Sequence, residues 1–277
     1  MCELLGLSAR LPTTLRVCLG EFARRGGGSG PHKDGWGVAW YEDQDVRLVK
    51  ESVAAHGSAC LGFIRENPFE TRLAIAHIRR ATQGGPSLRN SQPFMRELHG
   101  SMHVFAHNGD LDRIALRQRL RLGFHQPVGE SDSEYAFCGL LARLYGLWSG
   151  ASGTPSLERR LEVVSAFAAQ LRALGPANFL YADGDALFAH GHARLQDDHH
   201  VAPPGMHMVI RHAEAGGARQ EAVVFASVPV TREPGWRALE AGEIVVVRDG
   251  AIEGAERPLP CAHGANRREG AFHEHAH

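Results

Sequence analysis

The order in which strand-like and helical patterns follow one another is the feature that most restricts the fold of this chain. Strand-like segments dominate the first part, helical patterns occupy the middle from Ser131 to Leu174, and strand-like segments return from Phe179. This segregation argues against alternating βαβ units and favours α+β architecture, in which sheets and helices stack as separate layers. The fold class predicted from the sequence is therefore α+β.

The period of the apolar residues indicates the individual elements. Short apolar runs predict strands at 2–9, 35–41, 46–49, 72–79, 102–106, 179–182, 186–189, 207–211, 222–226 and 243–247. Helical spacing predicts helices at 13–25, 58–66, 111–122, 131–147 and 156–174. Ser131 with Glu134 three residues later matches a capping box, which marks the start of the first long central helix.

The predicted elements all fall within residues 2–257, which we expect to form a single domain. Residues 258–277 are rich in His, Arg and Ala without an apolar period, and are expected to be a mobile His-rich tail. The glycine-rich segment 26–34 lacks the GxxxxGK[ST] pattern and follows a helix rather than a strand. It is interpreted as a flexible loop beside a site, in preference to a phosphate cradle.

Composition excludes several classes of function. The formal net charge of -1 on 277 residues gives no basic footprint for nucleic acid. No apolar run approaches the roughly 18–20 residues of a membrane span, so no membrane role is expected. The five cysteines are scattered without a CxxC pair, and the N-terminus lacks a signal-peptide pattern. These observations predict free thiols and a cytoplasmic protein.

Cys2 combines a thiol with a position next to the initiator methionine. Methionine trimming, which we expect before so small a residue, gives Cys2 an α-amino group with a pKa of about 7.7–8.0 beside a thiol of about 8.5. That amine is able to take the proton of the thiol, directly or through water, as a nucleophile's own base. The alternative interpretation is that a cysteine simply happens to follow Met1.

Two further clusters each end a predicted strand. Arg79 lies in Ala76-His77-Ile78-Arg79-Arg80-Ala81-Thr82, where its planar guanidinium suits bidentate binding of a carboxylate. A surface or structural ion pair is the alternative. Asn108-Gly109 follows His107. The side-chain amide of Asn108 and the backbone N–H of the nearby glycine are suited to form an oxyanion hole. The alternative there is a type I′ hairpin turn, which the helical pattern of 111–122 weakens.

Asp132, inside Ser131-Asp132-Ser133-Glu134, supplies a carboxylate at the start of a predicted helix. One interpretation is that this carboxylate binds the ammonium group of a substrate. The alternative is that it only stabilises the positive end of the helix dipole. The His-rich tail, with Cys261 and His263, matches no closed zinc site and is interpreted as solvated. Neither a cofactor nor a metal is expected.

The four clusters, in this order, resemble the glutaminase domain of class-II glutamine amidotransferases, which are N-terminal-nucleophile hydrolases. The whole-chain pattern is most similar to the stand-alone bacterial YafJ-type members, and Asn90-Ser91-Gln92-Pro93-Phe94 is similar to the family's Asn-x-x-Pro-x segment. The resemblance implies a four-layer αββα sandwich. Three residues differ from the family pattern. Arg80 replaces the aromatic residue that is usual in synthase-linked members, and Gln92 and Phe94 replace residues that are often histidine.

The resemblance also implies a role for each candidate residue. Cys2 is the nucleophile and, through its amine, the base, while Asn108 and Gly109 form the oxyanion hole. Arg79 and Thr82 hold the α-carboxylate of glutamine, and Asp132 holds its α-ammonium.

Two classes of function fit this set of residues. The expected function is cleavage of a γ-glutamyl amide, in glutamine or in another γ-glutamyl metabolite, through a thioester on Cys2. Ammonia is then released, or passed to a separate ammonia-accepting subunit, since no synthase domain follows in this sequence. The alternative is a catalytically silent binding or regulatory protein on the same fold.

Overall fold

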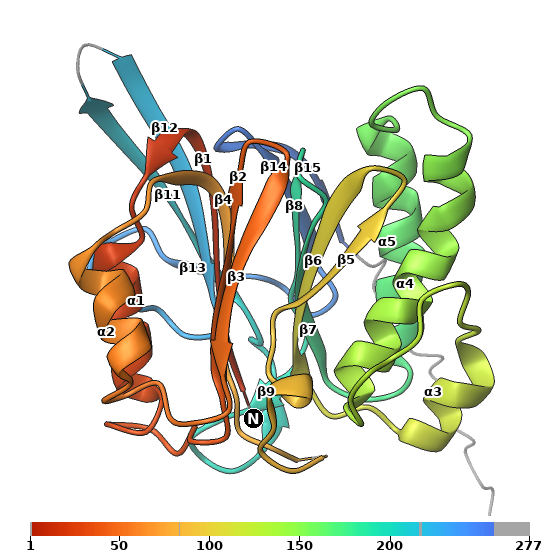
Figure 1. Ribbon diagram of the computed structural model, residues 1–277, viewed down its shortest axis with the longest axis horizontal. Helices are drawn as coiled ribbons and strands as arrows, with labels where there is room; N and C mark the ends of the chain where they lie inside the picture. Colours follow the sequence, from red (N-terminus) through yellow and green to blue (C-terminus); the bar gives the residue numbers. More distant parts are fainter. Residues whose placement is uncertain (1, 83, 216–217, 258–277) are drawn as a thin grey trace, which may run out of the picture.

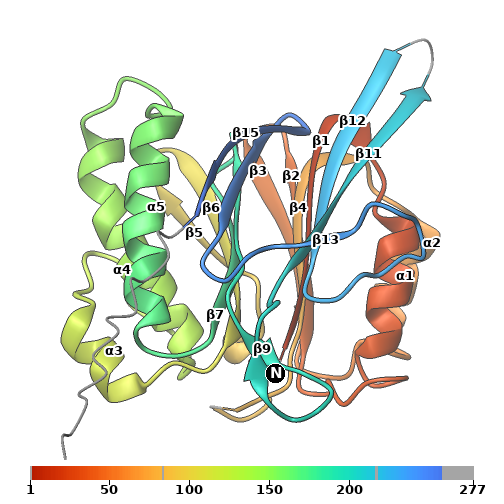
Figure 2. The ribbon, with the colours of Figure 1, turned by 180° about the vertical axis from the view of Figure 1, so that it is seen from behind.

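Two antiparallel sheets lie face to face between two layers of helices in the computed structural model, which describes residues 2–82, 84–215 and 218–257. Helices α1 and α2 cover one sheet, and α4 and α5 cover the other, with α3 beside α4 (Figure 1; from behind, Figure 2). The expected α+β fold and its four αββα layers are confirmed. The predicted tail 258–277 lies outside the described residues.

The helices agree with the predicted positions, with small shifts at their ends. Their bounds are α1 (Arg16–Arg25), α2 (Ala59–Glu66), α3 (Arg113–Arg119), α4 (Asp132–Ser149) and α5 (Leu157–Arg172), with a 3-10 turn at Leu88–Asn90. Ser131 caps α4, because its Oγ accepts a hydrogen bond from the N–H of Glu134 at 3.2 Å. The reciprocal half of the predicted capping box is wrong, since the Glu134 carboxylate accepts from the N–H of Gly129 instead.

The first sheet has seven strands in the order β13-β11-β12-β1-β4-β2-β3. Their bounds are β1 (Glu3–Thr13), β2 (Trp36–Glu42), β3 (Asp45–Glu51), β4 (Thr71–Ile78), β11 (His207–Ala215), β12 (Ala218–Ala226) and β13 (Arg237–Ala238). The second sheet has six strands in the order β15-β14-β8-β7-β6-β5. Its strands are β5 (Phe94–Leu98), β6 (Ser101–Gly109), β7 (Ala177–Ala182), β8 (Leu187–His190), β14 (Ile244–Arg248) and β15 (Ala251–Glu256). Strands β9 (Arg194–Leu195) and β10 (Val201–Ala202) form a separate pair.

Strand β1 is central to its sheet and is buried on both faces. Leu5 and Leu7 pack in the core beneath α1, whereas Leu4 belongs to the core between the two sheets. Alternate side chains of a strand point to opposite faces, so a strand buried on both sides needs a nearly continuous apolar run. That run follows Cys2 directly in the sequence, so Cys2 is held at the first end of a strand that is buried between the two sheets and the outer helices.

The strands absent from the predictions are β5, β9, β10, β13 and β15. Strands β5, β13 and β15 lie at the edges of their sheets, and β9 and β10 are two residues long. Most residues of β15 are exposed, so it carries little of the apolar alternation that identifies a strand. The predicted helix at 13–25 begins later, at Arg16, because β1 extends to Thr13.

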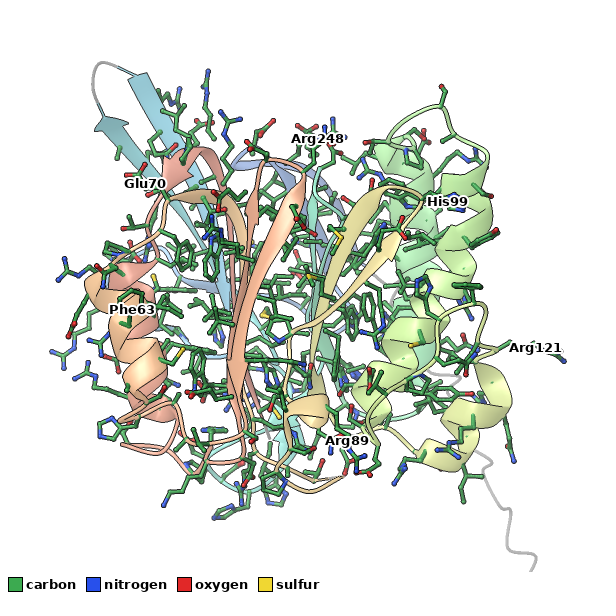
Figure 3. All side chains as sticks on the ribbon, in the orientation of Figure 1. Phe63, Glu70, Arg89, His99, Arg121 and Arg248 are labelled. Atoms are coloured by element: carbon green, nitrogen blue, oxygen red, sulfur yellow. The ribbon has the colours of Figure 1, made fainter. Side chains whose placement is uncertain are left out.

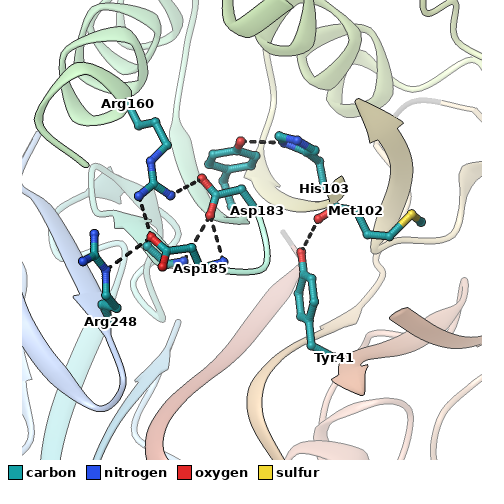
Figure 4. Close-up of polar contacts among 9 residues, drawn as sticks. Tyr41, Met102, His103, Arg160, Asp183, Asp185 and Arg248 are labelled. Atoms are coloured by element: carbon teal, nitrogen blue, oxygen red, sulfur yellow. Dashed lines mark hydrogen bonds and ion pairs between the residues drawn. The ribbon is translucent and has the colours of Figure 1, made fainter. Parts of the chain in front are cut away.

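A buried charged network closes the end of the sandwich remote from the N-terminus (Figure 4). Arg160 of α5 is 1% exposed and donates to the carboxylates of Asp183 and Asp185, which follow β7. Arg248 at the end of β14 approaches Asp185 at 3.2 Å. Nearby, the hydroxyl of Tyr181 and Nδ1 of His103 form a hydrogen bond of 2.7 Å. These contacts fix α5 and its connections on the second sheet.

Candidate active site

Cys2 lies immediately before β1, at the end of the sandwich where the N-terminus is found (Figure 1). Glu3 pairs with Ile78 of β4, so Cys2 is next to the residues that follow β4. Its thiol donates to the carbonyl of Arg80 at 3.4 Å, and the N–H of Arg80 donates to Sγ at 3.4 Å. The predicted nucleophile and the predicted arginine-containing strand end are therefore adjacent.

The electrostatic surroundings of Cys2 favour the neutral thiol at rest. Burial raises the pKa of this thiol, while the N–H of Arg80 and the guanidinium of Arg79 lower it in part. The carboxylate of Asp132 raises the pKa further. The thiolate is the nucleophilic form of cysteine, so any nucleophilic attack by this thiol would require a base that removes its proton.

Asn108 belongs to the opposite sheet but is tied to the strand that carries Cys2. Its Nδ2 donates to Oγ of Ser227 at 3.2 Å, and the same oxygen accepts from the N–H of Leu4 at 3.0 Å. Ser227 also donates its own N–H to the carbonyl of Leu4 at 3.1 Å. A carboxamide nitrogen carries two hydrogens, so one N–H of Asn108 remains for a ligand.

Gly109 ends β6 in a place where only glycine fits. A Cβ at this position would lie 1.8 Å from the carbonyl oxygen of Pro176. The neighbouring backbone is held by Asn178, whose Nδ2 donates to the carbonyl of Asn108 at 2.9 Å and to that of Ala193 at 2.7 Å. The hairpin alternative for Asn108-Gly109 is wrong, because β6 pairs with β5 and β7 and continues toward α3.

Arg79 is buried and binds the backbone of two loops. Its Nη1 donates to the carbonyls of Gly85 and Asp34 at 3.1 and 3.4 Å, and its Nη2 donates to the carbonyl of Gly84 at 2.8 Å. Asp34 ends the glycine-rich loop, and its carboxylate accepts from the N–H of Ala81 at 2.8 Å. The glycine-rich loop therefore flanks the site as predicted, and Arg79 organises the segment that contains the exposed Thr82.

Asp132 is buried at the first position of α4. Its Oδ2 accepts from the N–H of Leu111 at 2.9 Å, and its Oδ1 accepts from the hydroxyl of Ser133 at 3.4 Å. Its effect on the pKa of Cys2 places its charge within electrostatic reach of the sulfur. The carboxylate stabilises the start of the helix and also fixes the chain just after Asn108 and Gly109.

Several residues that hold these groups received no role from the sequence. Gln92 clamps the residue before Asn108, since it accepts from the N–H of His107 at 2.7 Å and donates to its carbonyl at 3.2 Å. The ring of His107 contacts the hydroxyl of Ser133 at 2.9 Å. Gln92 and His107 lie inside recognisable motifs, whereas Ser227 and Asn178 belong to no local pattern and were missed.

Two buried histidines lie beside the site, His77 between the two sheets and His107 on the face of β6 that packs against α4. Burial lowers the pKa of His77 well below its usual value, and the nearby Arg79 guanidinium lowers it further. Burial also lowers the pKa of His107, although the carboxylate of Asp132 offsets part of that effect. Both rings are therefore neutral at pH 7, and neither adds positive charge near Cys2.

The described part of the chain, without the tail, contains no group of three His, Cys, Asp or Glu side chains placed to hold a metal ion. Its helices also include none with the length and apolar character needed to cross a bilayer.

The two antiparallel sheets between two helical layers are the fold of the N-terminal-nucleophile hydrolase type. The sequence profile of the family described as glutamine amidotransferases class-II matches residues 1–270. The chain belongs to this family of class-II glutamine amidotransferases.

Relatives extend along nearly the whole chain. YafJ of Escherichia coli (strain K12) is 34% identical over 249 residues, which cover 88% of this chain and 96% of YafJ. The crystal structure of a predicted glutamine amidotransferase from Pseudomonas aeruginosa PA01 aligns with a TM-score of 0.63 at 29% identity, covering 91% of this chain and 100% of that one.

A more distant structure shares the fold. The glutamine phosphoribosylpyrophosphate amidotransferase from B. subtilis aligns with a TM-score of 0.56 at 18% identity, over 92% of this chain and 49% of that one. This similarity confirms the N-terminal-nucleophile hydrolase type of the four-layer sandwich.

Proposed function

We propose that this protein cleaves γ-glutamyl amides through a thioester on Cys2. The observation that carries the proposal is the bridge from Asn108 through Ser227 to Leu4. It ties the amide of Asn108, which has a second N–H to donate, to β1, the strand that begins beside the thiol. An oxyanion donor needs a fixed position relative to its nucleophile, and one such donor is worth about 10²–10³ in rate.

In the proposed reaction, Sγ of Cys2 attacks the γ-carbonyl carbon and the carbonyl π electrons move onto oxygen. Asn108 Nδ2 and the backbone N–H of Gly109 stabilise this oxyanion. The proton of the thiol passes to the α-amino group of Cys2, exposed by removal of Met1, and then to the leaving nitrogen. Ammonia or an amine departs, and water then hydrolyses the thioester, which releases glutamate and regenerates the thiol.

Two charged groups of opposite sign within electrostatic reach of the thiol suit the amino-acid end of the substrate. Arg79 would bind the α-carboxylate, with Thr82 beside it, and Asp132 would bind the α-ammonium. The guanidinium of Arg79 now contacts the carbonyls of Gly84 and Gly85, so a substrate carboxylate would replace these acceptors. Two opposite anchors would orient the amide toward Cys2 and lower the entropic part of the barrier.

We infer that residues 2–257 act as one catalytic domain in the cytoplasm. The amide nitrogen is either released or handed to a separate ammonia-accepting subunit. Comparison of glutamine with γ-glutamyl peptides and γ-glutamyl amines as substrates distinguishes hydrolysis of a metabolite from supply of ammonia.

The proposal is tested by intact mass spectrometry before and after treatment with 6-diazo-5-oxo-L-norleucine, a glutamine-analogue electrophile. We expect Met1 to be absent and one adduct to form on Cys2, with loss of amide hydrolysis. Cys2→Ala should abolish both adduct and hydrolysis, whereas Cys60→Ser on α2 should retain them. Retained Met1, or hydrolysis by correctly trimmed Cys2→Ala, would refute the mechanism and favour a silent binding protein.

A further inference from the structure

A groove of about 1510 Å³ on the outer helical layer is lined by residues of α1, α2, the loop before α2 and the segment 229–232. Its lining carries five arginines and a single acidic side chain, Glu21. The arginines are Arg16, Arg24 and Arg25 of α1, Arg65 of α2, and Arg232. This concentration of positive charge stands out on a chain whose net charge is -1.

Most of these cations lack a carboxylate partner. Arg16, Arg65 and Arg232 are exposed, and none of them forms an ion pair within the described residues. Arg24 pairs with Glu21 on its own helix. Like charges gathered along a groove repel one another and raise the local concentration of anions, so this surface favours an anionic ligand.

The shape of the groove favours an extended ligand. Its volume exceeds the roughly 300–1000 Å³ typical of small-molecule pockets. Arg16 and Arg24 are eight positions apart on α1, which separates them by about 12 Å along the helix axis. Gly57 and Gly62 leave open space at the groove, and the guanidinium of Arg65 leans toward Gly20 of α1. A polypeptide backbone has room to approach both helices.

We propose that this groove docks an acidic polypeptide segment of a partner protein. An extended chain advances about 3.3 Å per residue, so about four residues span the arginines of α1. Carboxylates spaced along such a segment would pair with guanidinium groups of α1, α2 and the 229–232 segment. Charge complementarity of this kind accelerates association and selects the partner.

The inner end of the groove connects with the catalytic strand. Arg25 places Nη1 at 3.3 Å from a carboxylate oxygen of Glu3 and donates from Nη2 to the carbonyl of Pro229 at 3.2 Å. Glu3 is the residue after Cys2, so Arg25 connects the groove to the start of β1. The inference goes beyond the proposed function, and binding to the groove does not require Cys2 to be reactive.

The test uses fluorescence anisotropy with a labelled polyglutamate peptide of about twelve residues, longer than the groove's arginine row. The full chain is compared with Arg16→Glu/Arg65→Glu, which leaves Arg25 and its contact with Glu3 intact. The matched control is Arg113→Glu/Arg121→Glu, which makes the same change of charge at two exposed arginines in and just after α3. These arginines lie on the opposite helical layer, and Figure 3 shows Arg121 far from Phe63 of α2. Polyglutamine, inorganic triphosphate and phosphatidylglycerol vesicles serve as competing probes.

We expect polyglutamate to bind, the groove variant to weaken its binding by at least about tenfold, and the α3 variant to change it by less than about twofold. Hydrogen exchange with bound peptide should show protection in α1, α2 and 229–232. Equal losses in the two variants would overturn the proposal, since they would reflect overall charge. Binding of triphosphate or vesicles without binding of polyglutamate would also overturn it, in favour of a phosphate ligand or a lipid surface.

Discussion

The side-chain amide of Asn108 donates a hydrogen bond to the hydroxyl of Ser227, which is 119 positions later in the chain. Ser227 directly follows β12 of the first sheet, whereas Asn108 lies on β6 of the second. The hydroxyl also accepts from the N–H of Leu4, so three segments meet at one oxygen. This buried hydroxyl therefore joins the second sheet to the first beside the start of β1.

Ser227→Ala should lower kcat by about tenfold or more with little change in KM, because the amide of Asn108 loses its fixed orientation. Steady-state hydrolysis of glutamine measures the effect. Ser8→Ala is the matched control, since Ser8 is also buried and its Oγ also accepts one backbone N–H, in the middle of β1. Similar losses of kcat in both variants would show that Ser227 acts through stability alone.

Asn108→Ala should reduce kcat by about 10²–10³, the usual effect of removing one oxyanion donor. Alkylation of Cys2 by iodoacetamide forms no oxyanion, so its rate should stay close to that of the wild type. Mass spectrometry of the alkylated protein over time supplies this comparison. A parallel fall in both rates would mean that Asn108 acts on the thiol itself.

Arg160→Ala should lower the free energy of unfolding by about 3–5 kcal/mol, because it leaves buried Asp183 without its cation. Arg159→Ala removes the exposed neighbouring arginine of the same helix, for which no ion pair is found within the described residues, and should change stability by less than about 0.5 kcal/mol. Urea denaturation followed by circular dichroism gives both values. A small effect of Arg160→Ala would show that Asp183 is protonated or solvated in the folded protein.

Stability should decrease as the pH falls below 6.5. Burial lowers the pKa of His103 to about 3 in the folded protein. Between pH 6.5 and pH 3, His103 therefore binds a proton in the unfolded chain but stays neutral in the folded protein. The stability contributed by neutral His103 is complete above pH 6.5 and is lost toward pH 3, at about 1.4 kcal/mol per pH unit. His103→Gln should therefore show a shallower dependence in urea denaturation between pH 7 and pH 5. Equal slopes in the two proteins would contradict this assignment.

The sequence was sufficient for most of the fold because β1, β4, α4 and α5 bury long, regular apolar patterns. It also proposed Cys2, Arg79, Asn108 and Asp132 as candidates, and their positions at the ends of strands or the start of a helix bring them to one end of the sandwich. The use of Arg79 to hold the carbonyls of Gly84 and Gly85 was not predicted, since backbone acceptors leave no trace in residue identity.

Ser227 was missed for a different reason. A lone serine after a strand is common, and its meaning here comes from two partners that are remote in sequence. The capping box failed in part for a related reason, because Arg96 and the N–H of Gly129 compete for the Glu134 carboxylate. Long-range contacts of this kind require the packed sheets to be known first.

Pairing of β1 with β4 begins at Glu3, one residue after the thiol. Any affinity tag fused ahead of Cys2 would convert its amine into a peptide bond, so recombinant protein intended for assays requires a tag at the other end or one removed to leave cysteine first. Under the mechanism proposed above, a protein with an N-terminal tag would fold normally and show no amide hydrolysis, because the tag removes the base.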